Sequence, residues 1–321
     1  MKTCTHALSD EQVALLPTEE DVAFYEEHGW YISKKVIPDE VIEEAIAGAQ
    51  RYYRGERDMQ LPMNGGYSDW KPGDGDTIRN NEYTALQNRQ LRKLALQPVI
   101  GAIAARLART KLIRLLDDQL IYKPPTGIEG ESVVGWHADK AYWSTSSSNS
   151  LLTAWVPFHD CDEAIGPLAV LDGSHKWPGT QDMRLFRDQN LEEIEQRLSQ
   201  EGRKVTKVVM TLKKGQMSFH HCRTIHGSQL NHSKSTRLSM AVHLQDEASH
   251  YQPYRNAKGE QIHFFQDSWC RKLPNGDPDY SDPAVFPTLW ESECTHSSHA
   301  VSGRPQHIFQ SSPGLPAPVS P

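Results

Sequence analysis

The stretch GWHADKAYW, residues 135–143, places a histidine and an aspartate two positions apart, as His137 and Asp139. Side chains alternate between the two faces of a strand, so on a strand both residues would point into one cavity. An imidazole and a carboxylate supply two of the three protein ligands of a facial metal site. Taken alone, the pair could also be an ordinary hydrogen-bonded pair at a strand end, so a metal site requires a third ligand elsewhere.

The third ligand must be chosen among many histidines, because the chain contains 15 of them. His220 and His221 are adjacent, so at most one of them can face a cavity, and we expect both to be structural. His226 differs because it ends a polar loop, is followed by Gly-Ser and precedes Arg237, which opens an apolar strand 11 residues later. The alternatives are a solvated loop histidine and a surface ion pair of Arg237. The histidines that could supply the third ligand are His159, His175, His220, His221, His226, His232 and His243.

Composition excludes several classes of protein. The chain of 321 residues has 37% hydrophobic and 23% charged residues, which is typical of a soluble globular protein. No apolar run is long enough to cross a bilayer, and the N-terminus lacks the apolar core of a signal peptide. A net charge of −7 without a basic stripe argues against nucleic-acid binding. Five scattered cysteines indicate reduced thiols, so we expect a cytoplasmic protein without a membrane or nucleic-acid partner.

The periodicity of the chain changes near residue 111. Before it, patterns predict helices over 18–28, 39–53 and 90–109, with a break at Pro98, and a strand over 30–37. After it, punctuated β-rich runs predict strands at 112–122, 132–143, 151–160, 167–175, 207–212, 216–221 and 237–245. Helices followed by strands predict a helical layer packed on a β-sandwich or barrel.

We expect residues 1–295 to form a single domain. It would comprise an N-terminal helical part at about 18–110, a β core at about 111–250 and a C-terminal extension at about 251–295. Residues 296–321 are rich in Ser and Pro and are expected to be a disordered tail. The polar segment 55–80 is a long loop of a kind that is often functional.

Three segments carry a resemblance to a known family: GWHADKAYW, LLTAWVPFHDCDEAIGPLAVLDGSHKWPG and GQMSFHHCRTIHGSQLNHSKSTRLSMAVHL. Together they resemble the phytanoyl-CoA dioxygenase family of Fe(II)- and 2-oxoglutarate-dependent oxygenases over about residues 18–245. The resemblance implies a mainly β double-stranded β-helix (a jelly roll, cupin-like) with flanking helices packed on one sheet. It also implies that His137, Asp139 and His226 hold Fe(II), and that 2-oxoglutarate and O2 are co-substrates.

The resemblance further implies contacts for the co-substrate. Arg237 would bind its distal carboxylate, since a guanidinium offers a planar fork and stays charged. The other family contacts fall on Gln119, Trp155 and Ser228. Gln119 replaces a methionine of the family's namesake, and the namesake's upstream lysine has no match around residues 80–82, which read Asn-Asn-Glu. Trp155 could equally be a core residue.

The reaction implied is oxidation of an unactivated C–H bond, hydroxylation by default, with release of succinate and CO2. Asp139 argues against halogenation, because related halogenases have Gly or Ala at this position. Tyr142 and Trp143 could line the substrate entrance or could be packing residues. The polar loops at 55–80 and 180–190 favour a small polar or specialised metabolite, while its identity and the oligomeric state stay open. The alternatives are a non-catalytic metal-binding jelly-roll module and a zinc hydrolase, which could use the same three ligands.

Overall fold

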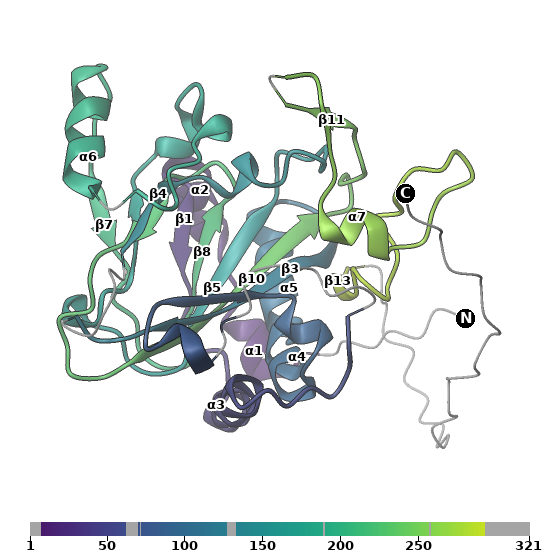
Figure 1. Cartoon of the computed structure of the whole chain (residues 1–321), viewed down its shortest axis with the longest axis horizontal. Coiled ribbons are helices and arrows are strands. Elements are labelled where there is room, and N and C mark those ends of the chain that lie inside the picture. The colour runs from purple at the N-terminus through teal and green to yellow at the C-terminus, as the bar shows by residue number, and fades with distance from the viewer. Residues whose placement is uncertain are drawn as a thin grey trace.

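The protein folds into two packed antiparallel sheets with helices at their edges and on one face (Figure 1). The computed structural model describes residues 8–61, 70, 72–126, 133–188, 190–256 and 258–292. The predicted disordered tail at 296–321 lies outside these residues. The prediction of a jelly roll with flanking helices is confirmed.

The larger sheet contains β1 (Trp30–Ile32), β2 (Arg79–Glu82), β3 (Leu112–Lys123), β5 (Leu152–Pro157), β8 (Ser218–His221), β10 (Arg237–Asp246) and β13 (Thr288–Glu291). Its order is β1-β8-β5-β10-β3-β13, and β2 also pairs with β3. The smaller sheet contains β4 (Val134–His137), β6 (Leu168–Leu171), β7 (Lys207–Val209) and β9 (His226–Ser228), in the order β4-β9-β6-β7.

Two of the predicted helix boundaries before the β core have a clear local cause. Helix α2 (Glu19–His28) starts after Thr18, whose side chain accepts from the Asp21 N–H, and stops at Gly29 with φ 78°. The predicted break at Pro98 is found, because α4 (Arg89–Ala95) ends before it and α5 (Pro98–Leu107) begins with it. The remaining helices of this part are α1 (Asp10–Ala14) and α3 (Asp39–Tyr53).

The two faces of the larger sheet have different roles. Alternate side chains of β5, namely Leu152, Ala154 and Val156, join the hydrophobic core that the sheet shares with α2, α3, α4 and α5. The intervening Thr153 and Trp155 point to the opposite face and line a cavity between the sheets. Figure 1 shows α3, α4 and α5 together on one side of this sheet. One face therefore stabilises the fold, and the other is available for a site.

Several elements differ from the predictions. The strand predicted at 30–37 ends at Ile32, and the helix α6 (Leu191–Gln200), which packs Leu191, Ile194 and Leu198 against the smaller sheet, was not predicted. Strands β2, β9 and β13 were also missed. The C-terminal part adds the hairpin of β11 (Tyr254–Arg255) and β12 (Gln261–Ile262) and the short helix α7 (Phe265–Trp269).

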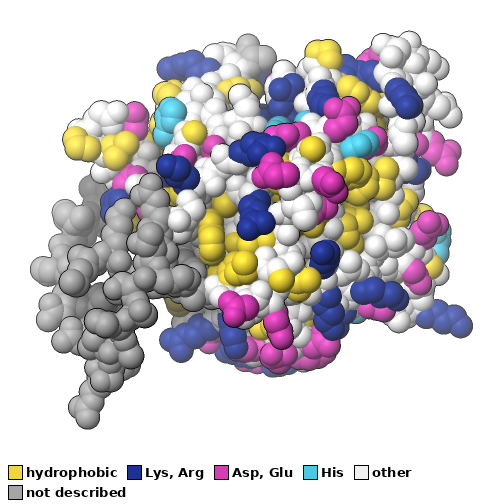
Figure 2. Space-filling view, turned by 180° about the vertical axis from the view of Figure 1, so that it is seen from behind, with side chains coloured by type: hydrophobic (Ala, Val, Ile, Leu, Met, Phe, Trp, Pro, Cys, Tyr) yellow, Lys and Arg dark blue, Asp and Glu magenta, His cyan; other side chains and the backbone are white. Residues whose placement is uncertain are grey.

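Among the described residues, no helix combines the length and apolar character needed to span a membrane. The face opposite the view of Figure 1 carries basic and acidic side chains interspersed, with hydrophobic side chains between them (Figure 2).

Candidate metal and co-substrate site

His137, Asp139 and His226 come together at the ends of two paired strands. His137 is the last residue of β4, His226 is the first residue of β9, and the two are partners in the ladder. The prediction that Asp139 continues the strand is wrong, because Asp139 begins a 3-10 turn that ends at Ala141. Asp139 nevertheless lines the same cavity as the two histidines.

Two glycines allow these strands to approach their neighbours closely. A Cβ atom at Gly135 would lie 1.9 Å from the carbonyl oxygen of Leu185, and one at Gly227 would lie 2.7 Å from that of Val134. Real side chains cannot occupy such positions without moving the backbone. The glycines beside His137 and His226 in the GWH and HGS motifs are therefore required by packing.

The three side chains present donor atoms that one metal ion could share. The Nε2 atoms of His137 and His226 lie 3.9 and 3.4 Å from Oδ1 of Asp139, and the ligand atoms all lie within 4.8 Å of one another. Each Nδ1 lies against a backbone carbonyl, that of Gly135 at 2.8 Å and that of Thr224 at 3.0 Å. Because Nδ1 donates to these carbonyls, both Nε2 atoms carry the lone pairs that a metal needs.

The protonation states also fit a metal. Burial lowers the pKa of His137, and burial together with the neighbouring His220 and His137 rings holds the pKa of His226 well below its usual value. Burial alone would raise the pKa of Asp139, but the His226 and His220 rings hold it well below its usual range. The site thus combines neutral imidazoles with an ionised carboxylate, which suits Fe(II) or another borderline divalent ion.

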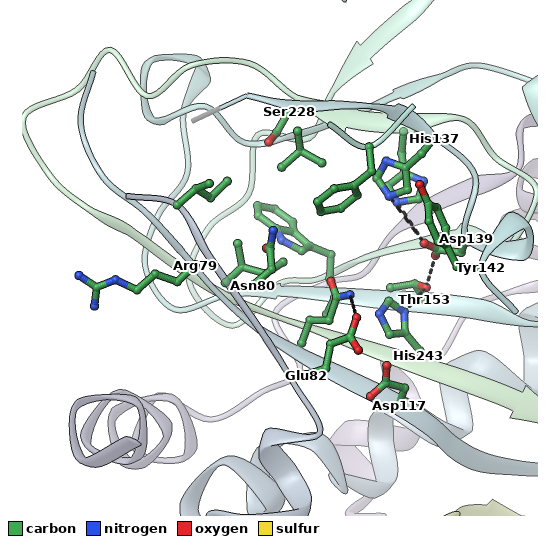
Figure 3. A pocket seen from close by; sticks show the side chains of 18 of the residues that line it. Arg79, Asn80, Glu82, Asp117, His137, Asp139, Tyr142, Thr153, Ser228 and His243 are labelled. Atoms are coloured by element: carbon green, nitrogen blue, oxygen red, sulfur yellow. Dashed lines mark hydrogen bonds and ion pairs between the residues drawn. The ribbon is translucent and has the colours of Figure 1, made fainter. Parts of the chain in front are cut away.

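Two side chains orient the Asp139 carboxylate. Oδ2 accepts from Thr153 Oγ1 at 2.6 Å (Figure 3), and it also lies 3.2 Å from Nε2 of His220. Both contacts hold Oδ2, so Oδ1 is left facing the two imidazoles. His220, which we expected to be structural, therefore lies at the site and fixes the orientation of a candidate ligand.

Thr153 links Asp139 to a further histidine. Because a carboxylate only accepts, Thr153 donates its single hydroxyl proton to Asp139. His243 Nδ1 lies 2.8 Å from the same hydroxyl oxygen and must therefore donate to it. This fixes the tautomer of His243 and leaves its Nε2 as a hydrogen-bond acceptor, in a residue that lines the cavity.

The contact between Thr153 and Asp139 is testable with an isosteric variant. We expect Thr153→Val to weaken binding of Ni(II), a redox-stable substitute for Fe(II), by about 10- to 100-fold, the usual effect of removing an outer hydrogen-bond partner of a metal ligand. Thr153→Ser keeps the hydroxyl and should retain the affinity. The measurement is calorimetric titration of metal-free protein, and an unchanged affinity in Thr153→Val would contradict the role of this contact.

His243 predicts a pH dependence of stability in the metal-free protein. Burial lowers its pKa from the usual 6.5 to about 4. Between these values the unfolded chain binds a proton that the folded protein does not, so stability falls as the pH drops from 6.5 towards 4. The contribution is about 1.4 kcal/mol per pH unit.

The comparison is with His243→Asn, whose amide can still donate to Thr153. Its free energy of unfolding, measured in urea from pH 7 to pH 4, should fall less steeply than that of the unsubstituted protein. His232→Asn controls for the removal of an exposed histidine. Equal slopes in His243→Asn and the unsubstituted protein would show that His243 does not stay neutral in the fold.

Arg237 lies at another part of the same cavity and is almost fully buried, with 2% of its surface exposed. Its Nη1 donates to the carbonyl of Gly166, its Nε has no hydrogen-bond partner among the described residues, and its guanidinium lies 5.4 Å from the centre of the Trp155 ring. Burial lowers its pKa to about 10, so it stays charged at neutral pH. A buried cation with an unused donor fits an incoming carboxylate.

Lys123 adds a second buried basic side chain beside Arg237, its partner in the β3–β10 ladder, and burial together with the Arg237 charge holds the pKa of Lys123 well below its usual value. Its Nζ donates to Ser228 Oγ at 2.6 Å and to the carbonyls of Ser228 and Gln229. It does not line the cavity, so it holds Ser228 in place rather than facing a ligand. Within the described parts of the chain, neither Lys123 nor Arg237 forms an ion pair with an acidic side chain.

The remaining predicted residues line the same cavity of about 810 Å³. Gln119 donates from Nε2 to Glu82 at 3.1 Å, so its amide contacts a carboxyl. Trp155 combines the two alternatives, since it packs in a hydrophobic cluster and also lines the cavity. Tyr142 and Trp143 line the cavity too, and Trp143 packs its ring 4.8 Å from that of His243.

Comparisons with known proteins agree with this geometry. The family model described as Phytanoyl-CoA dioxygenase (PhyH) matches residues 25–239. Peroxisomal phytanoyl-CoA dioxygenase of Bos taurus is 24% identical over 258 residues, which cover 74% of this chain and 72% of that protein. The probable alpha-ketoglutarate-dependent hypophosphite dioxygenase of Stutzerimonas stutzeri is 30% identical over 131 residues, or 40% of this chain and 44% of that protein.

Solved structures share the fold. The epimerase SnoN, in complex with Fe3+, alpha ketoglutarate and nogalamycin RO, aligns with a TM-score of 0.62 at 23% identity over 86% of this chain and 99% of that chain. EctD from S. alaskensis, with 2-oxoglutarate and 5-hydroxyectoine, aligns with a TM-score of 0.57 at 18% identity over 79% of this chain and 81% of that chain.

Fold and site together define a 2-oxoglutarate-dependent non-heme iron dioxygenase, with Fe(II), 2-oxoglutarate and O2 as its cofactor and co-substrates. The family match extends over most of the chain, and the chain belongs to the phytanoyl-CoA dioxygenase family.

Proposed function

We propose that His137, Asp139 and His226 hold Fe(II), and that the enzyme oxidises a C–H bond of a small polar or specialised metabolite, by hydroxylation as the default. Iron with bound 2-oxoglutarate supplies activation of O2, with succinate and CO2 as the products of the co-substrate. The chain contributes the ligand set, the anchor for the co-substrate and a largely buried cavity that limits access of water.

The observation that carries this proposal is that one cavity is lined both by a candidate metal site and by a buried cation. A His–Asp–His cluster and a buried guanidinium with a free donor both line it. We propose that the distal carboxylate of 2-oxoglutarate binds Arg237 with help from Ser228, and that Gln119 and Trp155 border it. Neither a metal-binding module without activity nor a zinc hydrolase needs such a buried anchor for a carboxylate.

The proposed substrate class is supported by the loops that we expected to be polar. Asp74 and Thr77 from the first loop, and Arg184 and Arg187 from the second, line the cavity together with Tyr142. Efficient turnover of a long-chain acyl-CoA would contradict a small polar substrate.

The test is an anaerobic titration of metal-free protein with Fe(II) and then 2-oxoglutarate, followed by the weak visible charge-transfer band of the chelate. The band should appear, and admission of O2 should then produce succinate, more rapidly with a substrate present. A band without succinate under any substrate screen would favour the non-catalytic module. Tight zinc binding without a band would favour the hydrolase.

A further inference from the structure

We propose that the end of the cavity formed by Glu82, Asp117 and His243, here called the acidic corner, binds a cationic nitrogen group of the substrate, an ammonium or an amidinium. This inference rests on the proposed function only in assigning the ligand as substrate. The corner itself is defined by side chains that the co-substrate site does not use.

The acidic corner is assembled by strand register. Glu82 on β2 pairs with Gln119 on β3, and Asp117 lies two residues before Gln119 on the same face of β3. His243 on β10 is the ladder partner of Asp117. Three adjacent strands therefore bring two carboxyls and an imidazole to one place, and Figure 3 shows Glu82, Asp117 and His243 directed into the same region.

The corner offers hydrogen-bond acceptors and lacks a cation. Glu82 is contacted by the Gln119 amide at 3.1 Å, and Asp117 by the backbone N–H groups of Asp118, at 2.6 Å, and Tyr83. In the described part of the chain, neither carboxyl pairs with Lys, Arg or His. The Arg79 side chain points away from the corner (Figure 3) and stacks on Trp70, with 3.6 Å from guanidinium carbon to ring centre.

His243 gives a second, independent reason to expect a ligand that donates hydrogen bonds. It is buried, with 4% of its surface exposed, and its Nδ1 donates to Thr153, so its Nε2 is an acceptor without a partner among the described residues. A ligand that reaches the corner therefore meets an imidazole lone pair and two carboxyls. An ammonium or amidinium group carries enough N–H donors to satisfy all three at once.

The electrostatics favour a positive charge on that group. Burial raises the pKa of Glu82 to about 7, and burial with the neighbouring Glu82 and Asp118 carboxyls raises that of Asp117 well above its usual value. Buried carboxyls lacking a counter-charge are stabilised when a cation arrives. A bound cation would draw both carboxyls towards their ionised form, whereas Arg237 at another part of the cavity fits an anionic co-substrate, so one cavity would hold the two ligands apart.

The test uses benzamidine and benzamide, which have nearly the same shape but differ in charge. Both are titrated into protein loaded with Ni(II) and 2-oxoglutarate, and again into metal-free protein. We expect benzamidine to bind at least about 10-fold more tightly than benzamide, the order of a charge-assisted hydrogen bond. The preference should disappear in the E82Q/D117N double variant and persist in E247Q, which removes an exposed carboxyl that does not line the cavity.

Equal binding of the two probes, including no binding of either at the limit of solubility, overturns the inference. So does a preference that survives in E82Q/D117N. Thermal unfolding verifies that the double variant is folded. If the double variant does not fold, the single variants E82Q and D117N are used instead, and each is expected to lose part of the preference for benzamidine. The titration of metal-free protein does not depend on iron chemistry. A negative result there contradicts the cation site, whereas absence of the charge-transfer band contradicts the proposed oxygenase function.

Discussion

We expect replacement of Arg237 by alanine to weaken binding of 2-oxoglutarate to the Fe(II)-loaded protein by about 30- to 5,000-fold. Truncating one partner of a buried, hydrogen-bonded charge pair costs about 2–5 kcal/mol, and that range converts to this factor. The guanidinium is buried and its Nε has no partner within the described structure, so no other residue there uses it fully. The measurement is the charge-transfer band during anaerobic titration with 2-oxoglutarate.

Two further variants make the result specific. Arg237→Lys keeps the charge without the planar fork and should lose an intermediate amount of affinity. Arg184→Ala removes a guanidinium that also lines the cavity but contacts Ser144 Oγ, at 3.1 Å, and should leave the affinity for 2-oxoglutarate nearly unchanged. An unaltered affinity in folded Arg237→Ala would place the co-substrate elsewhere.

The second large effect concerns the metal. We expect His226→Ala to weaken Fe(II) binding by more than about 100-fold and to abolish succinate formation, since loss of a ligand exceeds the effect of losing an outer partner. The control is His232→Ala, which removes an exposed histidine from the segment between β9 and β10. Metal content after dialysis and calorimetric titration with Ni(II) are the measurements.

His220→Ala decides which histidines are ligands. His220 Nε2 lies 3.2 Å from Oδ2 of Asp139, on the side away from the candidate ligand atom Oδ1. Its loss should therefore cost no more than the Thr153→Val change. A cost as large as that of His226→Ala would show that His220 belongs to the ligand set.

The sequence predicted the long elements of the fold well. Capping residues and apolar periodicity located α2, α3 and the break at Pro98, and β3, β5 and β10 have clear β-rich runs. Strand β9 has three residues, too few for alternation to be visible, and β13 depends on pairing with a distant strand. Helix α6 did carry a signal, because Leu191, Ile194 and Leu198 have helical spacing after the capping Asn190.

The candidate site was likewise predicted only in part from the sequence. Motif spacing was enough to select His137, Asp139 and His226, although Asp139 reaches the cavity from a turn rather than from a strand. Thr153 and His243 were not selected as site residues, yet the period of two could have found them. Once Trp155 and Arg237 are assigned to the cavity, residues at even spacing along their strands must share that face.

Glu82 could not be found in this way. The loop predicted at 55–80 overlaps only the start of β2 (Arg79–Glu82), and the position of Glu82 in the cavity depends on pairing between β2 and β3. Such pairing joins segments far apart in the chain, and a short polar strand carries no pattern that reveals its partner.

The candidate metal site and the acidic corner lie in one cavity but are built from different strands. The proposed ligand histidines, His137 and His226, belong to β4 and β9 of the smaller sheet, whereas Glu82 comes from β2, which pairs with β3 of the larger sheet. If both proposals hold, substitutions in β2 would change which substrates bind without altering the strands that carry the proposed metal ligands. Substrate selectivity could then be engineered within a four-residue segment, Arg79–Glu82, while the proposed metal site is kept unchanged.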